Sequence, residues 1–167
     1  MMKLITSVIL LMTFCVVGFS QQNVGAAAQN FTETTITGEK IELEQLKGKV
    51  VIISFWSTRC QICAAEIPKL NKLVSKYEGK DVVFIGLTNN NEEMVKNYLK
   101  KKPFDFKIIT NGFGVLLKYA DRDSENRLNM GYPAHFVVDR KGKVVLKTSG
   151  FKKADDLDNK ISKLLSE

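Results

Sequence analysis

Residues 49–77, KVVIISFWSTRCQICAAEIPKLNKLVSKY, place two cysteines between a strand pattern and a helix pattern. The run 50–56, VVIISFW, is apolar enough to be a strand that is buried on both faces, as central parallel strands are. Cys60 is predicted at the N-terminus of the helix that follows, and Pro68 is expected to bend that helix without ending it. Apolar side chains recur beyond the cysteines at helical spacing, at Ile67, Leu70, Leu73, Val74 and Tyr77.

A cysteine pair at such a strand-to-helix junction suits thiol-disulfide exchange, because one sulfur is presented outward while the other waits behind it. The backbone N–H groups and partial positive charge of a helix N-terminus favour the thiolate, the attacking form, at Cys60. Cys63 follows after two residues and can close the ring. Arg59, directly before the pair, either adds positive potential or points into solvent.

The segments on both sides of this stretch predict one α/β domain with a mixed central sheet flanked by helices. Upstream, residues 31–36 alternate apolar and polar side chains before a turn, which indicates an N-terminal β extension. Downstream, strand and helix patterns alternate and include a central β-α insertion. The expected elements there are strands at 81–88 and 104–110 and helices at 91–101 and 112–120.

The last third of the chain completes this pattern. Residues 120–132, ADRDSENRLNMGY, are polar and are expected to run over the surface as a loop that leads into Pro133. Residues 134–139 and 143–148 flank a turn and are expected to form an antiparallel hairpin. An amphipathic helix over 152–167 is expected to close the domain.

The N-terminal segment is typical of an exported chain. Lys3 is followed by the apolar run 4–19, LITSVILLMTFCVVGF, which carries no charge. We expect residues 1–28 to be a signal peptide, cleaved at about 20–28, and residues 29–167 to form the folded domain. An uncleaved membrane anchor is the alternative, although the run is slightly shorter than the ~20 residues of most spanning helices.

Small residues that suit a signal peptidase occur at two places in this segment, so the cleavage point stays open. They are Gly18 and Ser20, and then Ala26 and Ala28. Cys15 raises the alternative of a lipid-modified cysteine, but Phe14 precedes it and the apolar run continues after it. We interpret Cys15 as part of the discarded signal peptide.

Composition limits the classes of function. The 167 residues carry a formal charge of +7, and the hydrophobic and charged fractions, 44% and 26%, are those of an ordinary globular domain. The lysines are scattered, so an acidic partner or an anionic membrane surface is weakly indicated, and no nucleic-acid partner is expected. No glycine-rich phosphate loop is present, one histidine gives no Ser-His-Asp arrangement, and nothing indicates an oligomeric state.

Two motifs carry a resemblance to a known family. The segments KVVIISFWSTRCQICAAEIPKL (49–70) and GYPAHFVVDRKGKVV (131–145) resemble the TlpA/ResA-type thioredoxin-like thiol-disulfide oxidoreductases of bacterial cell envelopes. The similarity runs roughly from residue 31 to the C-terminus and implies a thioredoxin fold for residues 29–167. By this resemblance Cys60 is the nucleophile and Cys63 the resolving thiol, and the two form the redox-active disulfide.

The resemblance also implies roles for four further residues. Pro133 is the cis-proline beside the disulfide, and the backbone of Tyr132 binds an extended segment of the substrate. Glu66 is the acidic residue that tunes the cysteines. Trp56 packs beside the site and is grouped with the substrate-binding residues, with a place in the core as its ordinary interpretation.

The function implied by the resemblance is reduction of disulfides in exported proteins, including apocytochrome c, whose cysteines receive haem. Electrons come from a membrane thiol carrier. The expected location is the periplasm or cell envelope, with membrane anchoring as a variant. No cofactor and no metal are expected, since the disulfide itself is the redox group. The alternative direction, a disulfide donor, stays open.

Three residues depart from the family's pattern or fall outside it. Ile62 stands before the second cysteine, where relatives carry proline, so the reduction potential is not fixed by the sequence. Ser54 stands where thioredoxin places a buried acid, which leaves Glu66 as the best proton acceptor. His135, the only histidine, is expected to face a sheet surface rather than to act as an acid-base group.

Three rival interpretations remain from other classes of protein. A zinc site uses the same cysteine spacing but needs more ligands than two cysteines and one distant histidine supply. A peroxide-reducing enzyme resembles a Pro-X-X-X-Thr-X-X-Cys pattern, whereas this chain has Ser57 at the threonine position and lacks the upstream proline. A non-catalytic module would use the groove around Pro133 to hold a client or a haem-bearing chain.

Overall fold

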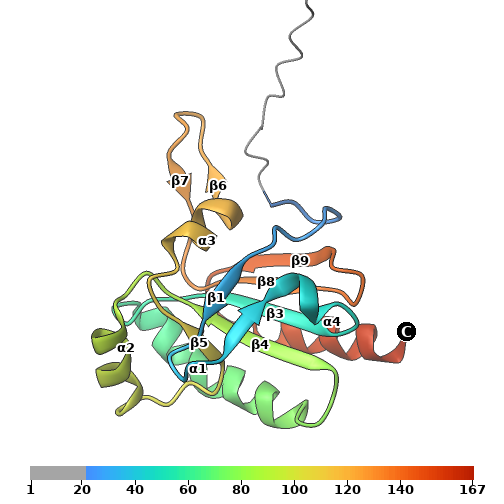
Figure 1. Cartoon of the computed structure of the whole chain (residues 1–167), viewed down its shortest axis with the longest axis horizontal. Helices are drawn as coiled ribbons and strands as arrows, with labels where there is room; N and C mark the ends of the chain where they lie inside the picture. Colours follow the sequence, from blue (N-terminus) through green and yellow to red (C-terminus); the bar gives the residue numbers. More distant parts are fainter. Residues whose placement is uncertain (1–21) are drawn as a thin grey trace, which may run out of the picture.

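A five-stranded mixed sheet forms the centre of the molecule (Figure 1), as seen in a computed structural model that describes residues 22–167. Its strand order is β5-β4-β3-β8-β9. The strands are β3 (Val50–Phe55), β4 (Val82–Leu87), β5 (Lys107–Ile109), β8 (Ala134–Val138) and β9 (Val144–Ser149). Strand β3 pairs in parallel with β4 and antiparallel with β8, which makes it the central strand of the sheet. The helix that carries the cysteines follows this strand directly in the chain.

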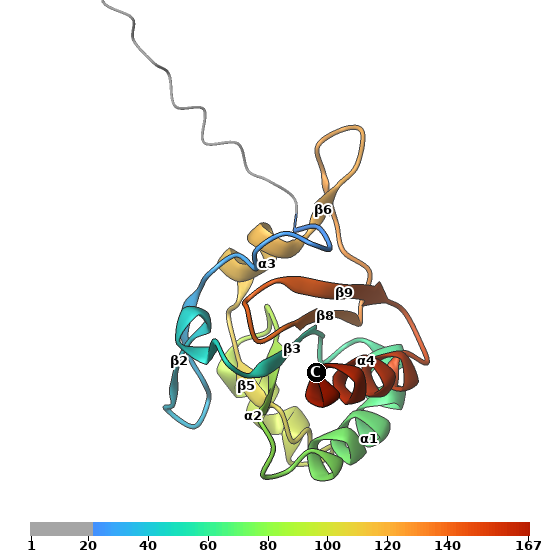
Figure 2. The ribbon, with the colours of Figure 1, turned by 90° about the vertical axis from the view of Figure 1, so that its right-hand side faces the viewer.

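Four helices cover the two faces of this sheet (Figure 2). They are α1 (Gln61–Lys76), α2 (Glu92–Leu99), α3 (Phe113–Tyr119) and α4 (Ala154–Ser166). Helices α1, α2 and α4 bury their apolar side chains in one core cluster, and α3 buries its own in a second cluster across the sheet. The result is the mixed α/β sandwich of helices and sheet that the sequence predicts.

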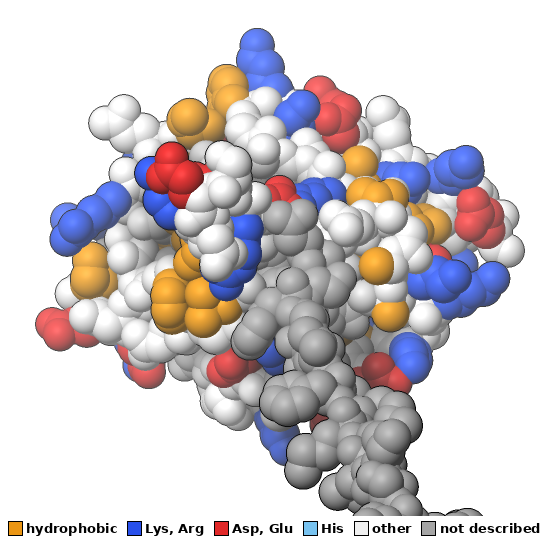
Figure 3. Space-filling view, turned by 90° about the horizontal axis from the view of Figure 1, so that it is seen from above, with side chains coloured by type: hydrophobic (Ala, Val, Ile, Leu, Met, Phe, Trp, Pro, Cys, Tyr) orange, Lys and Arg blue, Asp and Glu red, His pale blue; other side chains and the backbone are white. Residues whose placement is uncertain are grey.

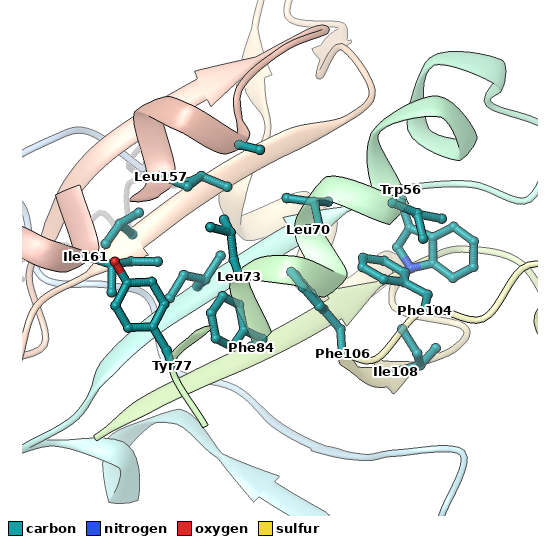
Figure 4. Close-up of a cluster of buried hydrophobic side chains, with 14 of the residues drawn as sticks. Trp56, Leu70, Leu73, Tyr77, Phe84, Phe104, Phe106, Ile108, Leu157 and Ile161 are labelled. Carbon is teal, nitrogen blue, oxygen red and sulfur yellow. The ribbon is translucent and has the colours of Figure 1, made fainter. Parts of the chain in front are cut away.

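The core beneath α1 and α4 is built from side chains at helical spacing (Figure 4). Leu70 and Leu73 of α1 meet Leu157 and Ile161 of α4 above the aromatic ring of Phe84. Burial of each such side chain contributes about 1.5–3 kcal/mol relative to an exposed one. This packing holds α1, and with it the cysteines, against the sheet.

The N-terminal β extension and the central insertion are both present. Strands β1 (Thr32–Thr34) and β2 (Lys40–Glu42) form an antiparallel pair, followed by a 3₁₀ turn, η1 (Leu43–Leu46). Helix α2 and strand β5 are the insertion, and β5 becomes an edge of the sheet. The N–H of Ile36 donates to the carbonyl of Ile108 at 2.9 Å, which ties the extension to the inserted strand.

The predicted signal peptide lies largely outside the described residues, as does Cys15. Residues 22–28 are described, and they run along the turn between β8 and β9. The N–H of Gly25 donates to the carbonyl of Val144 at 2.8 Å, and the N–H of Ala28 donates to that of Gly142 at 2.9 Å. Within residues 22–167, no helix has the length and apolar character needed to cross a bilayer.

The polar stretch 120–132 is not the plain loop that its composition suggested. It contains a short antiparallel hairpin, β6 (Asp121–Arg122) and β7 (Leu128–Asn129), which stands out from the body in Figure 1. The Asp123 carboxylate accepts the N–H groups of Glu125 and Arg127 at 2.9 and 3.0 Å, so a side chain closes this turn. The polar composition gave no sign of these strands, because they form a separate two-stranded sheet and bury no apolar face in the main core.

Charged side chains are mixed over the face that carries this hairpin. Figure 3 shows lysines and arginines spread among acidic and apolar side chains on that face.

Helix α1 runs without a break through Pro68, whose ring lies on the exposed side of the helix. The missing N–H of this proline therefore falls on the solvent side, which agrees with the predicted continuity of the helix.

Candidate active site

The two cysteines form a disulfide at the start of α1. Their Cα atoms lie 5.2 Å apart, and Cys60 is the N-cap residue of the helix. The N–H of Cys63 points at the sulfur of Cys60, with an N–Sγ distance of 3.0 Å. Cys60 is partly exposed, whereas Cys63 is only 2% exposed. The helix N-terminus thus directs a backbone donor and its partial positive charge to the accessible sulfur.

The loop that leads into Cys60 is held by Asn90, a residue that the sequence analysis did not single out. Its Oδ1 atom accepts the backbone N–H of Thr58 at 2.9 Å. The hydroxyls of Ser57 and Thr58 also donate to Oδ1, at 3.1 and 3.2 Å, and Thr88 donates at 3.1 Å. One amide oxygen therefore fixes the loop between β3 and α1, although nothing in the local sequence marks Asn90 for this role.

The predicted cis-proline is confirmed: the peptide bond between Tyr132 and Pro133 is cis. Ala134, the next residue, pairs with Phe55 at the end of β3, which places Pro133 at the same end of the sheet as the cysteines. The carbonyl of Pro133 accepts the N–H of Gly150 at 2.9 Å. Tyr132 is half-buried, and removal from solvent raises the pKa of its hydroxyl.

Trp56 belongs to the core and does not form part of the exposed surface. Its side chain is 1% exposed, and its ring centroid lies 5.4 Å from those of Tyr98 and Phe104. Gly86 of the neighbouring strand leaves room for it, since a Cβ there would stand 3.3 Å from Trp56 Nε1. The indole therefore supports the site from below, and a direct substrate contact would require it to move.

Glu66 lies one helical turn after Cys63 and is 1% exposed. Its Oε1 atom accepts the N–H of Ala154 at 3.1 Å and also the N–H of Lys153, at the beginning of α4. Burial by itself raises the pKa of this carboxyl, but the interaction with His135 and these two N–H donors outweigh it and hold the pKa below its ordinary value. Glu66 is thus a buried carboxylate, not an ordinary exposed helix residue.

His135 differs most from its sequence-based expectation. It was expected to face a sheet surface, yet it is completely buried in β8. Its Nδ1 atom lies 2.8 Å from the hydroxyl of Ser54, and its Nε2 atom lies 3.7 Å from Oε2 of Glu66. The antiparallel register places His135 directly opposite Ser54, and Glu66 of α1 reaches His135 from above the sheet. The only histidine is therefore next to the residue that was predicted to tune the cysteines.

A family model for the AhpC/TSA family matches residues 24–147, which include both cysteines and the cis-proline. The chain belongs to the AhpC/TSA family. A thiol-disulfide oxidoreductase, ResA, from Bacillus cereus is 33% identical over 97% of this chain and 96% of its own length.

Solved structures of similar proteins agree with this assignment. The thioredoxin domain of a thiol-disulfide oxidoreductase from Bacteroides vulgatus superposes with a TM-score of 0.71 at 26% identity, covering 86% of this chain and 98% of its own. An exposed lipoprotein thioredoxin from Streptococcus pneumoniae superposes with a TM-score of 0.65 at 25% identity, covering 81% of this chain and 100% of its own. This AhpC/TSA member is a ResA-like thiol-disulfide oxidoreductase with a thioredoxin fold.

Two exposed residues flank the accessible sulfur of this AhpC/TSA member. Ile62, which lies between the cysteines, is 46% exposed. Arg59 is also exposed, so its side chain is free to meet a substrate. Within residues 22–167, no three side chains of the metal-binding kinds gather at one place. The chemistry that this arrangement supports is sulfur exchange on thiol-bearing proteins.

Proposed function

We propose that the protein reduces disulfides in proteins outside the cytoplasm, with Cys60 as the nucleophile and Cys63 as the resolving thiol. The observation that carries this proposal is the unequal exposure of the two sulfurs. Cys60 caps α1 and is open to solvent, whereas Cys63 is 2% exposed behind it. A folded protein substrate can therefore meet only the sulfur of Cys60.

The first step of the proposed reaction begins from the reduced pair. The Cys60 thiolate attacks one sulfur of the substrate disulfide, and the other substrate sulfur leaves as a thiolate that takes a proton from solvent. The N–H of Cys63, which lies 3.0 Å from Cys60 Sγ in the disulfide form, is placed to stabilise the thiolate. A mixed disulfide between Cys60 and the substrate results.

The second step releases the substrate. Cys63 loses its proton and attacks Cys60, and the bond between Cys60 and the substrate breaks as the second substrate sulfur leaves with the electron pair. Two electrons have then moved from the cysteine pair to the substrate. We assign Glu66 as the tuning acid in this step, because it is the carboxylate one turn from Cys63.

The segment before β8 lies at the end of the sheet where the cysteines are, because Ala134 pairs with Phe55. We assign the backbone at Tyr132, which precedes Pro133, to hold an extended substrate segment beside the cysteines. Apocytochrome c is the proposed client, and a membrane thiol carrier the proposed electron donor. Export is supported by the charge-free apolar run at 4–19, which is typical of a signal peptide.

The reduction potential of the Cys60–Cys63 pair tests the direction of this reaction. The mature protein is equilibrated with dithiothreitol buffers, and the thiols are counted by mass after alkylation. A potential near thioredoxin's value of about −270 mV supports a reductase. A value towards about −120 mV makes the protein a disulfide donor instead. Failure of the pair to titrate would overturn the exchange chemistry and favour a binding module.

A further inference from the structure

Three buried polar side chains from three different elements form a row in the interior. Ser54 of β3 and His135 of β8 stand opposite each other across the antiparallel pair. Ser54 Oγ and His135 Nδ1 are 2.8 Å apart, and Glu66 of α1 lies beyond the far side of the ring, 3.7 Å from Nε2. All three side chains are at most 1% exposed, so bulk water does not screen their interactions.

The facing atoms of Glu66 and His135 are separated by more than a hydrogen-bond distance. Among residues 22–167, neither Oε2 of Glu66 nor Nε2 of His135 has a hydrogen-bond partner. A carboxylate only accepts hydrogen bonds, and a neutral imidazole carries one proton on one of its two nitrogens. At 3.7 Å the two atoms are too far apart for a direct hydrogen bond, and a buried acceptor without a donor is unfavourable. Oε2 of Glu66 is therefore a buried carboxylate oxygen with a free acceptor site, held next to the imidazole of His135.

Cys63 is the nearby group that must release a proton. It is 2% exposed and lies one turn before Glu66 in α1, which places the two on the same face of the helix. Strand β3, which carries Ser54, has no acidic side chain and so supplies no acceptor for this proton. Glu66 is the only carboxylate among the buried residues of the described chain.

The other groups around His135 leave this assignment intact. From β9, Thr148 pairs with His135 and does not titrate. From α4, the N–H groups of Lys153 and Ala154 hold Oε1 of Glu66, and the Lys153 ammonium pairs with Asp156 at 3.4 Å. The Lys153 and Asp156 side chains are thus paired with each other, and Oε2 of Glu66, which faces His135, keeps a free acceptor site.

We propose that His135 is a positioning residue. It holds the carboxylate of Glu66 in place to accept the proton that Cys63 releases. In the resolving step the Cys63 proton passes to the Glu66–His135 pair while Cys63 Sγ attacks Cys60 Sγ. The Cys60–substrate bond breaks, and the substrate sulfur leaves as a thiolate that takes a proton from solvent. The pair returns its proton to solvent before the next cycle. This inference rests on the proposed exchange at Cys60 and Cys63.

The test separates the two steps with Ellman's reagent and the fully reduced mature protein. Attack by Cys60 releases one coloured thiolate, and resolution by Cys63 releases a second. The amide of His135→Asn keeps a hydrogen-bond partner for Ser54 but has no atom at the position of Nε2. In this variant the second phase is expected to slow at least about tenfold at pH 7. The first phase is expected to stay within about twofold of the wild type.

The dependence on pH distinguishes a proton acceptor from a structural role. A Cys63 thiol that is already ionised at high pH needs no acceptor, so the slower second phase of His135→Asn is expected to approach the wild-type rate between about pH 7 and pH 10. A merely structural role of His135 would slow the second phase by the same factor at every pH. Glu66→Gln is expected to slow the second phase similarly, and the double variant to slow it no further, because the two residues act as one unit.

Val137→Ala is the matched control, since Val137 lies two residues along β8 on the same buried face. It is expected to lower the melting temperature and to leave the second phase unchanged. If His135→Asn does not fold, Ser54→Ala replaces it and is expected to slow the second phase. A second phase in His135→Asn equal to that of Val137→Ala at every pH would overturn the inference. A wild type without a first phase would instead overturn the proposed function.

Discussion

The carboxylate of Glu66 is held from both sides by parts of the chain that are distant in sequence. One oxygen accepts the backbone N–H groups at the start of α4, and the other faces Nε2 of His135 at 3.7 Å. Both side chains are at most 1% exposed. A charge buried this deeply persists only because fixed donors replace its lost hydration. The arrangement therefore links the stability of the fold to the site of sulfur chemistry.

Replacing Glu66 by Gln is expected to lower the free energy of unfolding at pH 7 by about 1–2 kcal/mol, because the N–H groups of Lys153 and Ala154 then donate to a neutral amide oxygen instead of a carboxylate. The folded-state pKa of Glu66 is depressed below its ordinary value of 4.5. The stabilisation is therefore complete above about pH 5 and is lost as the pH falls through the folded-state pKa. Urea unfolding of both proteins across this range measures the difference, which should shrink at low pH. A constant difference would contradict the prediction.

Replacing each cysteine by serine is expected to separate their roles. Cys63→Ser leaves the exposed nucleophile and is expected to accumulate a mixed disulfide with a protein substrate, which mass spectrometry detects. Cys60→Ser removes the partly exposed sulfur and is expected to give no such adduct, because Cys63 is 2% exposed. Equal adduct formation by both variants would reverse the assigned roles.

Gly86→Ala tests the packing that holds Trp56 under the site. A Cβ at Gly86 would lie 2.7 Å from Ile108 Cδ1 and 3.3 Å from Trp56 Nε1. Overpacking of this kind is expected to lower the free energy of unfolding by about 1–3 kcal/mol. Gly114→Ala in α3 is the control, since a Cβ there meets no atom within 4 Å, and it is expected to stabilise by about 0.5–1 kcal/mol. Similar values for both variants would refute the packing argument.

Asn90→Ala is expected to loosen the loop before Cys60, because its Oδ1 atom accepts the N–H of Thr58 and the hydroxyls around it. The expected loss of unfolding free energy is about 1–2 kcal/mol, with slower attack by Cys60 on Ellman's reagent. Asn90→Asp keeps an acceptor oxygen at this place and is expected to retain most of the rate. If the two variants react equally fast, Asn90 does not act through its oxygen.

Of the two places where a signal peptidase could cut, the structure favours the earlier one, at Gly18 and Ser20, over the later one at Ala26 and Ala28. The side chain of Gln22 is buried, its Oε1 accepts the N–H of Gln29 at 2.8 Å, and Gly25 bonds to β9. We therefore expect cleavage after Ser20, which keeps these contacts. The mass of the exported protein measures this directly. A chain that starts at residue 29 is expected to melt at a lower temperature than one that starts at residue 21.

Much of the fold could be predicted from the sequence because it depends on local periodicity. The run 50–56 and the helical spacing after it placed Cys60 at the start of α1, and the structure agrees. The polar stretch 120–132 was misjudged, since its short strands pair only with each other and carry no apolar alternation. Periodicity identifies an element only when one of its faces is buried in the main core.

By itself, the sequence determined the strand-to-helix junction, the cysteine pair and the proline before β8, because these features lie within a few residues of each other along the chain. Only the tertiary structure decided that His135 faces Glu66. Ser54 and His135 are 81 residues apart, and Glu66 meets the start of α4 across 87 residues. Strand register and helix packing create such contacts, so a lone histidine in an apolar strand gives no sign of them until β8 is paired with β3 and covered by α1.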